Sequence, residues 1–416
     1  MENKSLNETT LRPLGALESY SWQIDATCPK HFTVSAEING FTRIEDWSSA
    51  LKKVQSRHPL INSRIDATSD NHLYFFHDRT VEISLRVSRL NKISSIENEI
   101  KREFSAPIWT GDMALLKATL LYSEECCVII MTAHHAIADG RSLAHFIHDL
   151  LETLAGKNLP ELPLLPPIED LCKLDEESVG NIKTPDFSEE PVPYTERSLA
   201  NLQIFRQRLS PELSGRIRQR AKKENTTVHG ALSAAFTLAL YQSSAWHGRP
   251  VRICTPIDAR KYSASDYSLS FQALFPTYSY DASNAEDFWS IARKVTEDLN
   301  RYREKHGVVE WINLVGPAMK SNGLNGMIQF DREICAPDIL ISNLGVLPFS
   351  QRYGELTLES LWGPNVLVGT QDEQTIGVAT INDAIHLIHT SYNSAPGFLE
   401  NAINILSSVT KSTHLN

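Results

Sequence analysis

The residues best suited to chemistry are positions 134–140, which read HHAIADG. They leave an apolar run and enter an amphipathic one, and loops held by such rigid elements commonly carry functional side chains. Because side chains alternate along a strand, His134 and His135 should point to opposite sides, which argues against a metal ion shared between them. One imidazole can instead face a cavity as a general base while the other packs inside. Read alone, the segment is also compatible with a turn that carries no chemistry.

The elements on both sides of this loop follow from the spacing of apolar residues. Residues 113–121 and 126–133 are apolar runs of strand length. Residues 143–154 place their apolar side chains on one helical face, and Gly156 stands where such a helix would be capped. Residues 43–57 have the same helical spacing, and the following His-Pro should end that helix.

The second half of the chain repeats this mixture of helices and strands. Helices are predicted after Ser-Pro at 210–211, across 227–242, after a Ser-x-x-Glu capping box at 283–286, and across 398–406. Residues 251–260 predict a strand that ends at Arg260. Two further strands, 375–381 and 384–392, should be joined by Asn-Asp in a two-residue hairpin turn. The sequence therefore predicts a mixed α/β protein.

One segment differs sharply from the rest in composition. Residues 160–200 contain ten acidic residues against three basic ones, and seven of the 20 prolines. Such a stretch cannot easily form a packed core and predicts a long connector. We therefore expect three parts: an N-terminal lobe at 1–159, the acidic Pro-rich connector at 160–200, and a C-terminal lobe at 201–416.

The overall composition excludes several classes of protein. The chain has 416 residues and a formal net charge of −10, which argues against a general nucleic-acid binder and against attraction to anionic lipid. No run approaches the ~18 apolar residues that a membrane span needs, and the polar N-terminus lacks the apolar stretch of a secretory signal. The six cysteines form no C-x-x-C pair, so a cytoplasmic, reducing location is expected.

The loop HHAIADG resembles the His-His-x-x-x-Asp-Gly active-site motif of acyltransferases related to chloramphenicol acetyltransferase. That superfamily includes condensation domains of peptide synthetases, polyketide-associated acyltransferases and alcohol acetyltransferases. Further segments are similar to family motifs and occur in the family's order, so the resemblance covers essentially the whole chain. These segments are RPLGxxE at 12–18, HPL with Arg64 at 58–64, PIWxGD at 107–112, PIDAR at 256–260 and SNLG at 342–345.

The resemblance implies an α+β sandwich of two lobes, each a mixed sheet flanked by helices. The active site would lie between the lobes, in a channel that donor and acceptor enter from opposite faces. His135 would be the general base and the acceptor would attack the thioester directly, without an acyl-enzyme. Asp139 would pair with Arg260 from the other half and fix the loop, while His134 packs inside.

Three other residues are candidates for holding the reacting groups. Gly140 permits a tight turn, and its backbone N–H has the chemistry to face a developing oxyanion. Ser342 and Asn343 carry donors that either do the same or only shape a turn. A cluster of basic residues at 216–223 could meet the phosphates of coenzyme A, although a solvated helix face explains it more simply.

The sequence also departs from parts of the superfamily. The Asp-Phe-Gly-Trp-Gly segment of the plant branch is absent, and SFQALF at 270–275 replaces a stretch typical of condensation domains. No carrier-protein segment is evident. These departures favour a free-standing ester- or amide-forming enzyme of secondary metabolism over a synthetase module.

The expected function is acyl transfer from a thioester, on coenzyme A or an acyl carrier protein, to a small-molecule hydroxyl or amine, with a hydroxyl favoured. No metal or redox cofactor is implied. Two alternatives remain on the same scaffold: a non-catalytic module that binds carrier proteins, and a hydrolase that uses water as the acceptor.

Overall fold

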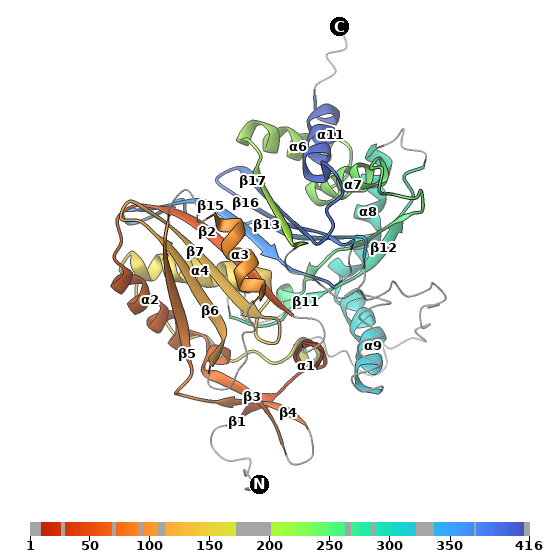
Figure 1. The fold of residues 1–416 in the computed structure, drawn as a ribbon. Coiled ribbons are helices and arrows are strands. Elements are labelled where there is room, and N and C mark those ends of the chain that lie inside the picture. Colours follow the sequence, from red (N-terminus) through yellow and green to blue (C-terminus); the bar gives the residue numbers. More distant parts are fainter. Residues whose placement is uncertain are drawn as a thin grey trace.

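Two six-stranded sheets form the centre of the described structure, and helices cover them (Figure 1). The computed structural model describes residues 10–25, 30–68, 72–90, 95–105, 113–171, 201–262, 268–283, 288–321, 337–369 and 372–411. The segment 107–112 and most of the connector 160–200 lie outside these residues. The division into two lobes and a connector therefore stays a prediction.

The first sheet has the strand order β14-β15-β2-β7-β6-β5. Its strands are β14 (Arg352–Tyr353), β15 (Leu356–Asn365), β2 (His31–Asn39), β7 (Cys126–His134), β6 (Met113–Tyr122) and β5 (Glu82–Arg89). Helices α2 (Ile44–Arg57) and α4 (Gly140–Leu154) pack on it in one hydrophobic core, and α3 (Ile96–Ser105) packs on it in a different core. The loop between β7 and α4 therefore lies at the end of an inner strand of this sheet.

Strand β15 belongs to the second half of the chain but completes the first sheet. It pairs antiparallel with β2, so that Leu361 lies opposite Ala36. Leu356 and Leu361 are consequently buried in the same core as α2 and α4. The two halves of the chain therefore share the first sheet and its hydrophobic core, which fixes the position of one half against the other.

The second sheet has the order β12-β9-β13-β16-β17-β8. Its strands are β12 (Thr277–Tyr280), β9 (Val251–Cys254), β13 (Ile339–Val346), β16 (Gln374–Ile381), β17 (Ala384–Ser391) and β8 (Gln203–Arg208). The covering helices, at the top of Figure 1, are α6 (Pro211–Lys223), α7 (Val228–Tyr241), α8 (Phe288–Asn300) and α11 (Phe398–Val409). Residues of β8 and β17 share a core with Ile130 and Trp362 of the first sheet.

Both sheets are mixed. Strand β13 runs parallel to β9 and β16, and β5 runs parallel to β6, whereas the other neighbours are antiparallel. The predicted fold class is confirmed. Smaller elements complete the described chain: β1 (Thr10–Pro13), β4 (Leu73–His77) and β3 (Ser63–Ala67) in one sheet, β10 (Ile257–Asp258) and β11 (Ala273–Leu274) in another, and helices α1 (Ala16–Ile24), α5 (Ile168–Leu171) and α9 (Lys305–Ser321).

The prediction of one continuous strand over 251–260 is wrong. Strand β9 ends at Cys254 and β10 begins at Ile257 in a different sheet, and Arg260 opens a short 3₁₀ turn. Pro256 lies between them, and proline has no backbone N–H to donate to a sheet ladder. The break turns the chain toward the first half, which is what brings Arg260 to the loop of residues 134–140.

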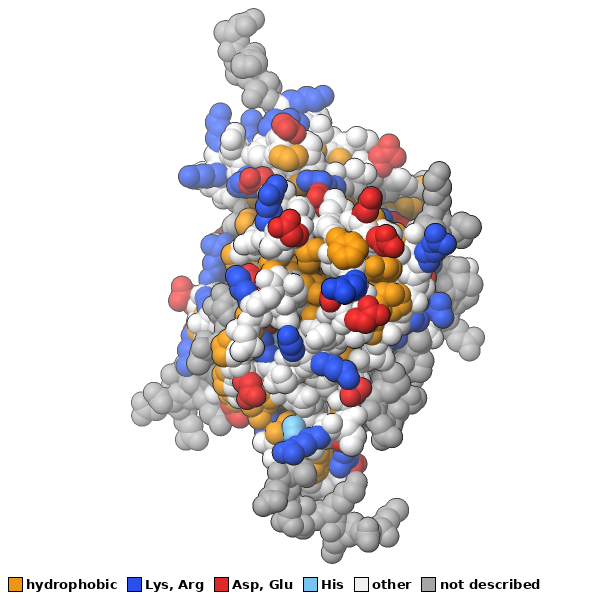
Figure 2. Space-filling view, turned by 90° about the vertical axis from the view of Figure 1, so that its left-hand side faces the viewer, with side chains coloured by type: hydrophobic (Ala, Val, Ile, Leu, Met, Phe, Trp, Pro, Cys, Tyr) orange, Lys and Arg blue, Asp and Glu red, His pale blue; other side chains and the backbone are white. Residues whose placement is uncertain are grey.

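Figure 2 shows the distribution of charged side chains on one face of the molecule. On the face shown in Figure 2, basic and acidic side chains are interspersed instead of gathering into a basic patch. Among the described residues, no helix combines the length and the apolar character that crossing a membrane requires.

Candidate active site

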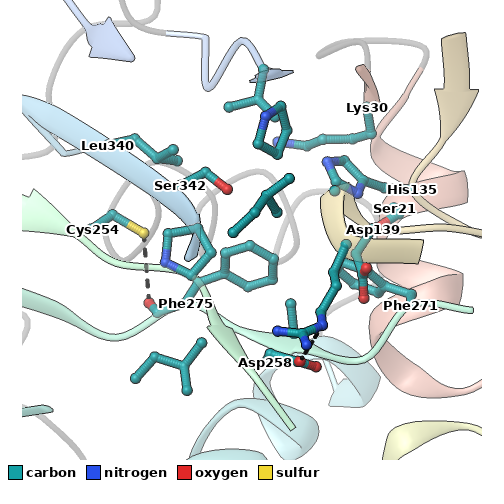
Figure 3. Close-up of a pocket in the computed structure, with 18 of the residues that line it drawn as sticks. Ser21, Lys30, His135, Asp139, Cys254, Asp258, Phe271, Phe275, Leu340 and Ser342 are labelled. Atoms are coloured by element: carbon teal, nitrogen blue, oxygen red, sulfur yellow. Dashed lines mark hydrogen bonds and ion pairs between the residues drawn. The ribbon is translucent and has the colours of Figure 1, made fainter. Parts of the chain in front are cut away.

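A pocket opens between the two halves of the chain at the loop that joins β7 to α4 (Figure 3). Its volume is about 1030 Å³, counting the part that is open to solvent. The first half contributes Tyr20, Ser21, Lys30, His135, Asp139, Gly140 and Arg141, and the second half contributes residues of β9, β10, β13 and the segment after β15. His135, Asp139, Gly140, Arg260, Ser342 and Asn343 all line it, so the structure brings six of the seven candidate residues together.

His135 is partly exposed to this pocket and firmly oriented. Its backbone N–H donates to the Lys30 carbonyl at 2.9 Å, and its ring stacks on Phe32 with centroids 4.2 Å apart. Nδ1 lies 3.1 Å from the Ala138 carbonyl oxygen. Because a carbonyl only accepts, Nδ1 must carry the hydrogen, which leaves the lone pair on Nε2. The described residues give Nε2 no hydrogen-bond partner, so it is available to take a proton.

The surroundings of His135 keep its ring neutral. Burial lowers the pKa of His135 to about 3, and the hydrogen bond to Ala138 offsets only part of this effect. The neutral form that a general base requires is therefore present throughout the physiological range. The charged form is disfavoured until an opposite charge develops beside it.

Acidification should also destabilise the whole protein. Burial lowers the pKa of His31 and His386 to about 4, and that of His145 and His389 to about 3. These groups bind protons at ordinary pKa values only in the unfolded chain, so stability is full above about pH 6.5 and falls as the pH drops below it. At pH 5 each group should cost up to about 2 kcal/mol, at about 1.36 kcal/mol per pKa unit. Urea unfolding at pH 7.5 and pH 5 measures this, and equal midpoints would contradict it.

His134 lies outside the pocket and is fully buried. Its Nδ1 accepts a hydrogen bond from the Ala136 N–H at 2.9 Å, and its Nε2 lies 3.4 Å from Asp25 Oδ1. Asp25 also accepts from the Lys30 N–H at 2.5 Å. His134 thus joins the end of α1 to the backbone of the loop, and it supports the loop instead of reaching a substrate.

Asp139 and Arg260 form the ion pair that the resemblance implies. Arg260 Nη1 lies 2.7 Å from Asp139 Oδ2, and both side chains are almost completely buried. The second guanidinium nitrogen, Nη2, donates to the Ser270 carbonyl at 2.9 Å, and Nη1 also donates to Asp258 at 3.2 Å. The pair joins the two halves of the chain at the wall of the pocket.

Asp139 has structural partners on both sides of the pair. As the N-cap of α4 it accepts from the Ser142 N–H at 3.0 Å, and it accepts from the Gln272 N–H at 2.9 Å. Burial by itself would raise the pKa of Asp139, but the charge of Arg260 and these hydrogen bonds hold the pKa below its usual value. Asp139 therefore stays ionised and fixes the start of α4 against the segment that carries Gln272.

Gly140 is required for a close approach and not for a turn. It is the first residue of α4 and its φ is not positive. A Cβ atom at this position would lie 2.1 Å from Pro364 Cγ and 3.3 Å from Leu344 Cδ2. The expected turn is therefore corrected: the residue is small because β13 and β15 pass directly over the helix N-terminus.

Replacing Gly140 by alanine should damage both stability and activity. The added methyl group must displace Pro364, and overpacking of this kind typically costs about 1–3 kcal/mol. Gly215 in α6 offers a matched control, because a Cβ there meets nothing within 4 Å. Gly215→Ala should be neutral or stabilising, as is usual in helix interiors. Thermal unfolding and kcat/KM of both variants test this, and similar behaviour of the two would contradict the steric reading.

Ser342 and Asn343 lie on β13 across the pocket from the loop. Ser342 is drawn in Figure 3 on the same side as Leu340 and Cys254. Asn343 Oδ1 accepts from the Gly345 N–H at 2.8 Å, and Gly345 has a φ of +70°. Asn343 Oδ1 therefore holds the irregularity within β13, where the register with β16 shifts between Asn343 and Val346. This contact does not commit the two candidate donors, the Asn343 Nδ2 group and the Ser342 hydroxyl.

Sequence reasoning did not assign several pocket residues. Phe271 packs against His135, with ring centroids 5.3 Å apart, and belongs to the segment SFQALF. Lys30 lines the pocket and its carbonyl positions the His135 backbone. Residues 366–368 also line it. Only the departure of SFQALF from the condensation-domain pattern drew attention to any of these positions.

The basic residues 216–223 do not line the pocket. They belong to α6, where Arg220 pairs with Glu224 at 2.8 Å and Arg218 with Asp383 at 3.6 Å. These surface contacts agree with a solvated helix face.

Two family models match successive parts of the chain. Residues 29–170 match a model described as "Condensation domain", and residues 200–363 match one described as "Phthiocerol/phthiodiolone dimycocerosyl transferase C-terminus". Among curated proteins, one of the linear gramicidin synthase polypeptides of Brevibacillus parabrevis is 24% identical over 316 residues, which cover 68% of this chain. The chain spans only 6% of that polypeptide, and 2% of another polypeptide of the same synthase, to which it is 26% identical over 167 residues.

Solved structures share the fold over almost the whole chain. Polyketide synthase associated protein 5 from Mycobacterium tuberculosis superposes with a TM-score of 0.67 and 16% identity, covering 97% of this chain and 99% of that one. The trichothecene 15-O-acetyltransferase of Fusarium sporotrichioides gives a TM-score of 0.70 and 13% identity, covering 96% and 94%. The two family models match the chain in order and solved structures of both kinds share its fold, so the resemblance to condensation domains and polyketide-associated acyltransferases is confirmed.

Proposed function

We propose that this protein transfers an acyl group from a thioester to a hydroxyl or amine acceptor, with His135 as the general base. The observation that carries the proposal is the position and tautomer of the His135 imidazole. His135 lies in the pocket between the halves with Nδ1 directed at the Ala138 carbonyl and the lone pair on Nε2. The matches to a condensation-domain model and to a transferase model support the same proposal.

The proposed reaction needs one proton transfer in each direction. The acceptor O–H or N–H gives its proton to His135 Nε2 while its oxygen or nitrogen forms a bond to the thioester carbonyl carbon. The tetrahedral intermediate then expels sulfur, and the imidazolium returns the proton to the thiolate. An acyl-enzyme is not required, and His135 is neutral again at the end of the reaction.

The charge on the intermediate compensates the cost of charging His135. The imidazolium is disfavoured in the empty pocket, as the lowered pKa of His135 indicates. A neighbouring oxyanion supplies the opposite charge at the moment the proton moves. The Gly140 N–H at the start of α4, the Ser342 hydroxyl and the Asn343 Nδ2 group are our candidates for donors to that oxyanion, and all three residues line the pocket.

The donor and acceptor belong to the proposal as well. We propose that coenzyme A or an acyl carrier protein carries the acyl group, that a small-molecule hydroxyl is the favoured acceptor, and that the two enter from opposite faces. The reaction as proposed needs no metal or redox cofactor. We also propose a reducing, cytoplasmic location. The described cysteines Cys126, Cys127 and Cys254 are unpaired thiols, which fits such a location.

Incubation with a panel of acyl-CoAs and acyl carrier proteins, each with alcohols and amines, tests the proposal. Mass detection of an acylated acceptor is the expected result. Thiol release that needs no acceptor would instead indicate a thioester hydrolase. Absence of release from every thioester, together with binding of a carrier protein, would indicate a non-catalytic carrier-binding module.

The pH dependence of kcat/KM offers a separate check. Because the pKa of His135 lies at about 3, kcat/KM should show no loss of base between pH 8 and pH 6. An ordinary imidazole would lose half its activity near its usual pKa of about 6.5. Initial rates measured on protein shown to be folded at each pH give the profile, and a half-point near 6.5 would contradict the desolvated state of the ring.

A further inference from the structure

The pocket has an apolar arm at the end away from His135. We define the arm by Cys254 of β9, Phe275, Leu340 of β13, and Val366 and Val368 of the segment after β15. Cys254, Leu340 and Val368 are buried together as a small hydrophobic cluster, with Phe275 and Val366 partly buried against it. Figure 3 shows Cys254 and Leu340 across the cavity from His135.

The wall formed by residues 366–368 is held in place by buried polar groups. Thr375 Oγ1 donates to the Val366 carbonyl at 2.9 Å. The Glu373 carboxylate, which is 1% exposed, accepts from the Val368 N–H at 3.1 Å and from the Gly369 N–H. These polar groups bind the backbone of residues 366–369 and so hold it in place, which fixes the position of the Val366 and Val368 side chains that line the cavity.

The arm itself carries no charge. Burial raises the pKa of the Cys254 thiol to about 12, so it stays neutral. The charged side chains on the second-half wall, Asp258 and Arg260, belong to the ion pairs with Arg141 at 3.3 Å and with Asp139 at 2.7 Å. The pocket is thus polar beside the reacting centre and apolar beyond Ser342.

We propose that the apolar arm binds a hydrocarbon chain or ring of one substrate, and that the enzyme selects that substrate by its apolar part. The inference rests on the proposed function, which places the reacting atoms at His135. Two sources fit the same chemistry: the acyl chain of the thioester, or the body of the acceptor. Pockets of this kind commonly gain affinity from apolar walls and orientation from a few polar groups.

Two substrate series distinguish the sources. One runs from acetyl- to decanoyl-CoA with a single acceptor, and the other runs from ethanol to octanol with acetyl-CoA. In the series whose substrate enters the arm, kcat/KM should rise about fourfold for each added methylene until the arm is full. This factor follows from about 0.8 kcal/mol gained per buried methylene, since 1.36 kcal/mol corresponds to a tenfold change in rate. A flat response in both series would overturn the proposal.

Variants of the arm test its position. Val368→Phe fills the arm, and the ratio of kcat/KM for the longest and shortest substrates should fall at least about tenfold, as for loss of two buried methylenes. Leu340→Ala lengthens the arm and should shift the optimum toward longer substrates, which keeps the test open if Val368→Phe does not fold. Val346→Phe is the control, because Val346 lies on the same strand as Leu340, is 68% exposed and does not line the pocket. A ratio that is unchanged in both arm variants would overturn the proposal.

Binding of N-phenyl-1-naphthylamine, a neutral apolar fluorophore, separates this inference from the proposed function. Wild type and Val346→Phe should bind it, and Val368→Phe should bind it at least tenfold more weakly. That result in a protein without transferase activity would support the arm while the proposed function fails. Equal binding by all three proteins, in an enzyme that transfers every chain length alike, would reject the arm while the proposed function stands.

Discussion

Alanine at position 135 should lower kcat/KM for acyl transfer by about 10²- to 10⁴-fold while the protein still folds, because that is the usual contribution of a positioned general base. The ring is partly exposed to the pocket, and its principal packing partner is one face of Phe32. Its loss therefore removes the proton acceptor without opening a large sealed cavity. Initial rates with a fixed thioester and acceptor, together with thermal unfolding, measure the two effects separately.

The matched control for this prediction is His247→Ala, since His247 is exposed and does not line the pocket. Its activity should equal that of the wild type. His135→Ala with wild-type kcat/KM would remove the base from the mechanism. An equal loss of activity and of stability in His135→Ala would show that the ring acts through folding, which the geometry at Nε2 does not suggest.

The local elements could be predicted because their signals are local. The helix over 43–57 and the strands before the loop agree with α2, β6 and β7 to within about a residue, since apolar spacing at a period of 3.6 or 2 reports burial of one face directly. The hairpin at residues 382 and 383 follows from two residues that tolerate positive φ, and the structure gives them φ values of 49° and 59°. Such features depend on neighbours in sequence.

The parts that escaped prediction depend on neighbours in space. Nothing in the sequence of β15 marks it as a strand of the first sheet, because its partner β2 lies more than 300 residues away in the chain. The same holds for Phe271 and residues 366–368, which reach the pocket only because β13, β15 and the residues on both sides of β11 converge there. Their apolar character predicts burial and says nothing about facing a cavity.

The site itself was predictable only where a motif marks it. The spacing of residues 134–140 identified the loop, and the resemblance supplied its partner Arg260 from the other half. The reason for Gly140 could not be read from the motif, because it lies in the approach of Pro364 from β15. Motifs name the residues that act, and the contacts across the two halves show why they are held.

Removal of Asp139 should destabilise the protein by about 3–5 kcal/mol, because it strands a buried guanidinium. Arg260 is 1% exposed, and the Ser142 and Gln272 N–H groups lose an acceptor in the same change. We expect Asp139→Ala to lose activity mainly by unfolding or by disorder of the loop. Asp139→Asn, which keeps the shape and part of the hydrogen bonding, should be less destabilised. Urea unfolding at pH 7.5 measures both free energies.

A double-mutant cycle distinguishes this structural role from a catalytic one. Arg260→Leu alone strands the Asp139 carboxylate, whereas Asp139→Ala with Arg260→Leu leaves neither charge buried, so the double variant should be destabilised by less than the sum of the two single variants. A coupling of this sign arises only if the two charges hold each other inside the protein. Asp139→Ala that unfolds like the wild type but transfers no acyl group would place the carboxylate in the reaction itself. Additive effects in the cycle would show that the 2.7 Å contact contributes nothing to holding the halves together.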